Sequence, residues 1–268
     1  MDDLSETDGL SQPPGRTAVV IGHPGHELRV HGWLEVTNPV VFVLTDGSGR
    51  STQSRLPSTT KILNRTGAKC GPIYGRLTDV AAYAAILNHD FDLFVGLANE
   101  LFEAFVVERI DYVAGDACEG YNPVHDVCRL VINAAVTAAR RSSGHRVENL
   151  EFSLLNQPNH CHEPHTDGLC RILDDAAFAR KMAAANGYTE LAGEVQAAVE
   201  QTAIASLRVE CLRPVSPGPG GYACDQPPFY ESYGEKQVAA GHYQKVLRYH
   251  EHMAPLAEAL SRYAEGTT

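Results

Sequence analysis

The sequence predicts an α/β fold: a Rossmann-like, mostly parallel sheet with helices on both faces. Two patterns support this prediction. Short β-branched apolar runs alternate with longer segments whose apolar residues recur at helical spacing, as in βαβ units. Three of these runs lead directly into loops rich in histidine or acidic residues, and in such sheets ligands bind beyond the carboxyl ends of the strands. The chain has 268 residues, 44% hydrophobic and 21% charged, which is enough for a sizeable core and excludes disorder as the dominant state.

The first half of the chain carries the clearest alternation. Runs rich in valine and isoleucine, bounded by glycine, proline or polar residues, predict strands at residues 17–22, 39–44 and 110–115. Apolar residues at helical spacing predict helices at residues 28–36, 58–66, 79–89, 92–109 and 126–141. The loops that contain the candidate site residues therefore all follow strands.

The second half of the chain has weaker patterns. We expect strands at 150–155 and 205–212, a loop rich in proline and glycine at 214–228, and helices at 174–186, 189–202 and 236–263. The organisation we predict is a flexible lead-in at 1–16 and a single α/β metallo-hydrolase-like domain at 17–268, with a core at 17–155 and a C-terminal elaboration at 156–268.

Charge and cysteine usage narrow the class of protein. The formal net charge of −11 repels nucleic acid and anionic membrane surfaces, so neither is expected as a partner. No apolar run is long enough to cross a bilayer, and the first residues lack the features of a signal peptide, so we expect a cytoplasmic protein. The seven cysteines are odd in number and form no CxxC pair, which favours reduced thiols over a disulfide framework. The oligomeric state is left open.

Three histidines suggest a metal site. His23 and His26 are three residues apart at a strand-to-helix turn, and His125 follows another strand. A catalytic zinc ion takes three protein ligands and keeps one open position, and neutral imidazole is among its commonest donors. The alternative is chance proximity among twelve scattered histidines, which suits His89 and His242 well. It suits the three strand-end histidines poorly. Iron, cobalt, nickel and copper accept the same donors.

A second histidine cluster occupies residues 160–165, with three histidines in six residues. One interpretation is a separate metal site or a loop that faces the substrate. The other is a polar loop between prolines, and this interpretation is favoured over a structural zinc site because no cysteine pair is spaced nearby.

The order of these motifs resembles the LmbE-like or PIG-L family. An apolar strand precedes His23-Pro-Gly-His-Glu27, a second strand ends in Thr45-Asp-Gly47, and Asn122-Pro-Val-His125 leads into an alanine-rich helix. Members of that family are Rossmann-like, zinc-dependent de-N-acetylases of N-acetylglucosamine conjugates and related amides. They carry His-Pro-Asp-Asp-Glu and His-Pro-Asp-His at these places. The resemblance covers roughly residues 17–140.

The resemblance implies a metal held by three histidines, with His23, His26 and His125 at the positions of the family's ligands. His26 stands where the family has a carboxylate ligand. The family's general base corresponds to Gly25, and the leading histidine of its second motif corresponds to Asn122. The metal frame is kept while both groups that handle protons are replaced.

Two kinds of chemistry follow from these replacements. A zinc ion with three neutral ligands keeps more positive charge and lowers the pKa of bound water to about 7, so hydrolysis by a metal-bound hydroxide needs only a weak base. The alternative is a non-hydrolytic reaction, such as elimination, isomerisation or redox chemistry, on a small metabolite. A third possibility is a protein that binds a sugar or metal without turnover.

Several other side chains near the strand ends are candidates, each with a structural alternative. As catalytic groups we consider Asp116 and Glu119 for proton transfer, Tyr121 or Asn122 for the oxyanion, and Glu27. Glu27 and Asp126 equally suit helix starts, and Tyr121 equally suits packing over its loop. For substrate binding we consider Asp46, Arg50 and Arg55, although Asp46 also suits a turn or a partner of a ligand histidine. The aromatic run 229–233 is either a lid over the crevice or a cover for the core.

The function predicted from sequence is therefore hydrolysis of an amide or N-acyl bond on a small polar, sugar-like molecule. The expected cofactor is zinc or another divalent transition metal, and the expected partner is the small-molecule substrate alone.

Overall fold

The computed structural model describes residues 15–49, 51, 53–144, 146–155, 168–201, 204–215 and 226–266. The expected lead-in at 1–16 lies almost wholly outside these residues. So do Arg50, the histidine cluster at 160–165 and most of the loop at 214–228.

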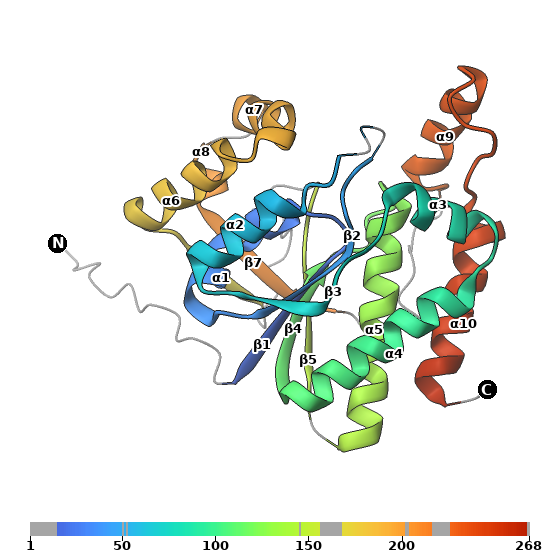
Figure 1. Cartoon of the computed structure of the whole chain (residues 1–268), viewed down its shortest axis with the longest axis horizontal. Helices are drawn as coiled ribbons and strands as arrows, with labels where there is room; N and C mark the ends of the chain where they lie inside the picture. Colours follow the sequence, from blue (N-terminus) through green and yellow to red (C-terminus); the bar gives the residue numbers. More distant parts are fainter. Residues whose placement is uncertain are drawn as a thin grey trace.

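A seven-stranded sheet forms the centre of the molecule, with the order β3-β2-β1-β4-β5-β7-β6 (Figure 1). The strands are β1 (Arg16–Ile21), β2 (Val40–Thr45), β3 (Lys69–Leu77), β4 (Ile110–Asp116), β5 (Glu148–Phe152), β6 (Leu169–Ile172) and β7 (Val209–Pro214). The pairs among β1 to β5 are parallel, and β7 pairs antiparallel with both β5 and β6. The predicted fold class, a mostly parallel α/β sheet, is confirmed.

Helices cover both faces of the sheet because its central strands are apolar on both sides. In β1, Ala18 and Val20 pack into one core and Val19 and Ile21 into the other. Helices α4 (Phe91–Glu108), α5 (Pro123–Ser143) and α10 (Ala254–Glu265) lie on the first side in Figure 1, and α1 (His31–Thr37) and α2 (Leu56–Thr66) lie on the second. None of the helices in the described part of the chain is both long and apolar enough to cross a bilayer.

Strand β3 was not predicted, and its composition explains why. Gly71 and Pro72 interrupt the apolar pattern, and both residues are depleted in strand interiors. Because β3 is an edge strand that pairs only with β2, a proline is tolerated there. The end of β3 leads into α3 (Asp79–Leu87), whose first residue belongs to the candidate site.

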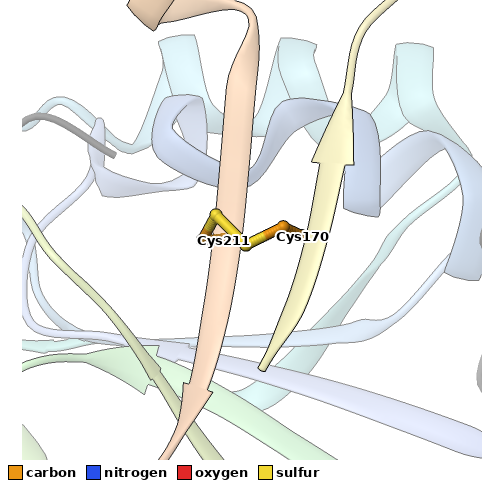
Figure 2. The surroundings of a disulfide bond; sticks show 2 residues. All are labelled: Cys170 and Cys211. Carbon is orange, nitrogen blue, oxygen red and sulfur yellow. A yellow bond between two sulfur atoms is a disulfide. The ribbon is translucent and has the colours of Figure 1, made fainter. Parts of the chain in front are cut away.

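The prediction of reduced cysteines was wrong for one pair. Cys170 of β6 and Cys211 of β7 are direct partners across the antiparallel ladder and form a disulfide (Figure 2). The two cysteines are 41 positions apart, so no local spacing motif marks them. Their pairing follows from strand register, and β6 itself was not predicted.

The C-terminal region also departs from the predicted single helix at 236–263. Helix α9 (Phe229–Ala239) ends before Gly241, whose φ of 74° suits a glycine. A π-helical turn (Tyr249–Met253) then leads into α10, which has a proline in its first turn. Before this region lie α6 (Asp175–Asn186), α7 (Ala192–Gln201) and α8 (Ile204–Leu207). Two 3-10 turns each lead directly into a helix: η1 (His26–Val30) precedes α1, and η2 (Thr189–Leu191) precedes α7.

The strand order places a topological switch point beside β1. The chain runs from β1 outward to β2 and β3, and then returns to β4 on the other side of β1. In open α/β sheets the ligand crevice lies beyond the carboxyl ends of the two strands at such a point, which here are β1 and β4.

Candidate metal centre

Three histidine rings meet at the switch point. His23 lies in the loop after β1, His26 begins η1, and His125 lies in the first turn of α5, after β4. The ring centroids of His23 and His26 are 5.4 Å apart, those of His23 and His125 are 5.1 Å apart, and those of His26 and His125 are 4.6 Å apart. The structure therefore brings together the three histidines selected from the sequence.

Local backbone geometry creates this convergence. Gly25 has a φ of 109°, a conformation that L side chains rarely adopt, and it turns the chain between the first two histidines. At the other loop, the Asn122 side chain caps α5 by accepting a hydrogen bond from the backbone N–H of Val124 at 2.9 Å. Pro123 occupies the first helical position, where no N–H is needed. His125 is thus fixed within the first turn of a well-capped helix.

The ring of His23 is held by two oxygen atoms. Its Nδ1 lies 3.0 Å from Oδ1 of Asp79 and 2.8 Å from Oγ1 of Thr45. The Thr45 hydroxyl donates to the carbonyl of Gly22 at 2.9 Å, so Nδ1 carries the proton and donates to the acceptors around it. The lone pair is then on Nε2, which is buried and makes no hydrogen bond within the described residues.

The ring of His26 is held by Asp116, the last residue of β4. Nδ1 of His26 lies 2.8 Å from Oδ2 of Asp116, and the same oxygen accepts a hydrogen bond from the backbone N–H of Gly22 at 2.7 Å. The Asp116 side chain is fully buried. Because a carboxylate only accepts hydrogen bonds, Nδ1 of His26 carries the proton and Nε2 keeps its lone pair.

His125 is the most deeply desolvated ring of the three. Burial lowers its pKa well below the usual value for histidine, and the nearby rings of His26 and His23 lower it further. Its Nδ1 is buried and lacks a hydrogen-bond partner in the described part of the chain. The imidazole is therefore neutral, which is the form that binds metal ions.

The donor set fits a zinc ion. Nε2 of His23 and Nδ1 of His125 are buried and have no hydrogen-bond partner among the described residues, and carboxylates hold Nδ1 of His23 and of His26, as they do for histidines that bind metals. As the side chains stand, no group of three histidine, cysteine or acidic residues in the described part of the chain has the spacing to hold a metal ion. The centroids of the three imidazole rings lie between 4.6 and 5.4 Å apart.

Asp79 and Thr45 were missed by the sequence analysis. The Asp79 carboxylate is buried beside His23, and its Oδ2 accepts a hydrogen bond from the backbone N–H of Gly49 at 2.6 Å. Burial by itself raises the pKa of Asp79, but the hydrogen bonds and charge of its partners, His23 first, hold the pKa well below the usual value. The available signal was an acidic residue after a strand, but that strand, β3, was itself not recognised.

Two of the other carboxylates considered from the sequence are buried and bonded to backbone groups. Glu27 accepts hydrogen bonds from the Gly25 N–H at 2.6 Å and the Thr59 hydroxyl at 2.8 Å. Asp126 accepts from the N–H groups of Glu119 and Gly120 at 3.0 and 3.2 Å. Burial raises the pKa of each carboxyl group to about 7 despite these bonds. Both side chains shape the loops that carry the histidines.

Glu119 and Asp46 accept hydrogen bonds from backbone and hydroxyl groups of the loops around them. The Glu119 carboxylate accepts hydrogen bonds from the Ser153 hydroxyl at 2.6 Å and from the N–H groups of Leu154 and Leu155, so it fixes the chain after β5. Asp46 accepts from the N–H and hydroxyl groups of Ser48, as a turn residue does. Among the described residues, neither carboxylate bonds to a histidine ring of the site, in contrast to Asp79 and Asp116.

The remaining candidates lie around the rim. Oδ1 of Asn122 accepts from the Val124 N–H and, at 3.4 Å, from the Tyr83 hydroxyl, a residue that the sequence analysis also missed. Tyr121 is 45% exposed and stacks on Phe229. Arg55 precedes α2, and its carbonyl oxygen accepts a hydrogen bond from the Tyr188 hydroxyl at 3.3 Å.

A side chain at residue 25, the position that the sequence resemblance matches to a general base, would meet Leu191. A Cβ atom at Gly25 would lie 2.3 Å from Cδ1 of Leu191, which comes from η2 in the C-terminal region. The side chain is therefore missing at residue 25, and the space that it would enter is filled by another residue.

Comparisons with known proteins identify the fold of the chain but do not assign it to a family. No family model matches the chain, and no curated protein sequence matches it. Among solved structures, the chain is similar to a deacetylase of the A40926 pseudoaglycone, with a TM-score of 0.50, 15% identity, and coverage of 75% of this chain and 96% of that one. It is also similar to a deacetylase from the biosynthesis pathway of teicoplanin, with a TM-score of 0.50, 12% identity, and coverage of 75% of this chain and 98% of that one. The chain thus shares the α/β fold of two deacetylases across most of its length.

Proposed function

We propose that the protein is a metal-dependent hydrolase that removes an acyl group from the nitrogen of a small polar, sugar-like metabolite. The observation that carries the proposal is the set of three neighbouring imidazoles at the switch point, two of them held by buried carboxylates. The fold shared with two deacetylases supports the reaction class. The resemblance of the two histidine motifs to the LmbE-like family supports it independently.

His23, His26 and His125 would hold the ion, and zinc suits their donor atoms best. When bound, such an ion supplies the positive charge that polarises an amide carbonyl and acidifies a water molecule. The residues of the chain position that charge. Asp79 and Asp116 fix two of the rings with the proton on Nδ1 and the lone pair on Nε2.

Asp116 is the carboxylate that we assign to proton transfer. Its Oδ2 is used by His26 and Gly22, whereas Oδ1 is buried and makes no hydrogen bond to the described residues. Both oxygens of Glu119 are used by the chain after β5, which disfavours the alternative assignment. Oδ1 of Asp116 would accept the proton from the attacking water and return it to the leaving nitrogen.

Asn122 is the donor that we assign to the substrate carbonyl. Within the described residues, both hydrogen bonds of its side chain are accepted by Oδ1, so the orientation of the amide is fixed and Nδ2 is available as a donor at the rim of the site. A fixed donor of this kind stabilises negative charge that develops on the carbonyl oxygen of an amide.

The test combines metal analysis with acyl release. We expect about one zinc ion per chain in the purified protein, and acetate release from a panel of N-acetylated amino sugars that chelation abolishes and zinc restores. His26→Ala and His125→Ala should lose both metal and activity. His242→Ala is the matched control for loss of an imidazole, because His242 is exposed and follows α9, not β1 or β4. A His26→Ala variant that keeps stoichiometric metal would refute the ligand set.

A non-hydrolytic metal-dependent reaction is the second candidate. The Leu191 side chain favours it, because it occupies the space that a side chain at residue 25 would enter. Full zinc occupancy without release of acetate from any acyl donor in the panel would support this candidate over hydrolysis.

A further inference from the structure

Three exposed aromatic rings form a continuous stack, here called the aromatic ladder: Tyr121, Phe229 and Tyr233. The rings of Tyr121 and Phe229 are almost parallel, with centroids 5.0 Å apart and an interplanar angle of 7°. Phe229 and Tyr233 are 6.0 Å apart at 28°. The three residues are 45%, 49% and 39% exposed, respectively.

The ladder does not serve as a cover for the core. Helix α9 packs onto the protein through Tyr230, which is 5% exposed and belongs to the main hydrophobic core. Phe229 and Tyr233 are four residues apart on the same helix and keep much of their surface in water. Large aromatic side chains that gather on the surface are typical of binding sites.

The ladder begins at the rim of the candidate metal centre. Tyr121 directly precedes Asn122, the cap of the helix that carries His125. The backbone N–H of Tyr230 donates to the carbonyl of Gly120 at 3.4 Å, which ties the start of α9 to the same loop. A molecule whose reacting group lies at the imidazoles therefore has the ladder beside it.

The charge beside the ladder disfavours an anionic ligand. Two acidic residues of α9, Glu231 and Glu235, are both paired with Arg248, at 3.1 and 2.7 Å. The single guanidinium balances one of these two carboxylates, so a net negative charge remains on these three side chains, and the ladder offers ring faces as its recognition groups. Ring faces bind flat groups with weakly polar C–H surfaces, such as an aromatic ring or the apolar face of a sugar.

We propose that the aromatic ladder is the binding platform for a second ring of the substrate, a sugar or aromatic ring attached to the N-acylated unit, which stacks on Tyr121. This inference rests on the proposed hydrolytic function and deepens it: Tyr121, Phe229 and Tyr233 are the residues of this chain that select the group attached to the N-acylated unit. Tyr121 then acts through its ring and not through its hydroxyl.

The first test compares three acylated substrates: methyl N-acetylglucosaminide, phenyl N-acetylglucosaminide, and a disaccharide in which N-acetylglucosamine carries an unacylated hexose. We expect the KM of the ring-bearing substrates to be about 3- to 10-fold below that of the methyl glycoside, with kcat unchanged. A preference for the phenyl glycoside alone identifies an aromatic ring, and a preference for the disaccharide alone identifies a sugar. Equal KM values for all three substrates would overturn the proposal.

Variants of the ladder distinguish the contribution of the Tyr121 ring from that of the Tyr121 hydroxyl. Tyr121→Ala and Phe229→Ala should bring the KM of the ring-bearing substrates up to that of the methyl glycoside, whereas Tyr121→Phe should keep the preference. Val107→Ala, at an apolar residue of α4 that is 77% exposed, is the control for loss of exposed apolar surface. A preference that persists in both alanine variants, or that Tyr121→Phe abolishes, contradicts stacking on the ladder.

A binding measurement separates this inference from the proposed reaction. Phenyl and methyl glucosaminides without an acyl group cannot be deacylated, so their affinities are measured by calorimetry without turnover. If no acyl donor is hydrolysed but the phenyl compound binds more tightly than the methyl compound in the wild type and not in Tyr121→Ala, the platform stands and the proposed function fails. If acetate is released and neither assay shows a ring preference, the function stands and the platform fails.

Discussion

Asp116 connects both loops of the candidate metal centre through a single oxygen atom: Oδ2 accepts hydrogen bonds from Nδ1 of His26 and from the backbone N–H of Gly22. The residue is the last of β4, whereas its partners follow β1. The carboxylate therefore fixes the orientation of the ring across the switch point.

Asp116→Asn should weaken zinc binding by about 10- to 100-fold, because a neutral amide holds the histidine less firmly and makes its ring less basic. Competition with a chelator of known affinity measures the change. Asp46→Asn is the matched control, since Asp46 follows β2 but bonds to Ser48. Equal zinc affinities for wild type and Asp116→Asn would show that this contact does not support the metal.

Gly25→Asp should not restore a general base. The new Cβ would collide with Leu191, and the φ of 109° is strained for any L residue, so we expect a loss of stability of about 1–3 kcal/mol. Gly25→Ala should lose a similar amount. Combining Gly25→Asp with Leu191→Ala should relieve the collision and leave the backbone strain. Urea denaturation measures all three variants, and a fully stable Gly25→Asp with raised activity would contradict the assignment.

The disulfide between Cys170 and Cys211 should stabilise the fold by about 2–4 kcal/mol, because it closes a long loop in the unfolded chain. The double variant Cys170→Ser/Cys211→Ser should lower the free energy of unfolding by this amount under non-reducing conditions. With a reductant present, wild type and variant should differ much less. Peptide mapping of the unreduced protein should recover the linked peptides, and their absence would refute the bridge.

A buried ion pair between Lys181 and Glu210 contacts the first turn of α1. Nζ of Lys181 lies 2.9 Å from Oε1 of Glu210, and the Glu210 carboxylate accepts hydrogen bonds from the N–H groups of Gly32 and Trp33. Lys181→Met should destabilise the protein by about 3–5 kcal/mol, because it leaves a buried carboxylate without its partner. Adding Glu210→Gln should recover part of the loss, as measured by denaturation. Additive losses in the double variant would show that the two side chains do not interact.

The sequence predicted the part of the site that depends on local pattern. Histidines placed directly after apolar strands marked His23, His26 and His125, because strand ends in a parallel sheet share one edge. Asp79 was not predicted, because Gly71 and Pro72 interrupt the apolar pattern of β3, the strand that precedes it. Leu191 and Phe229 reach the site from distant parts of the chain, and their approach depends on how the C-terminal region packs. No periodicity encodes such contacts.

The disulfide between Cys170 and Cys211 likewise depends on tertiary structure. Cys170 and Cys211 carry no spacing signal, and only the antiparallel register of β6 and β7 makes them neighbours. Residue patterns predict elements, whereas tertiary register decides which elements touch.

The two borders of the sheet are each protected against joining another chain. At one border, Pro72 removes a hydrogen-bond donor from β3. At the other, the bridge between Cys170 and Cys211 prevents β6 from slipping along or peeling away from β7. Unpaired strands are the usual starting points of aggregation, so reduction of this bridge should make the protein prone to self-association before it unfolds.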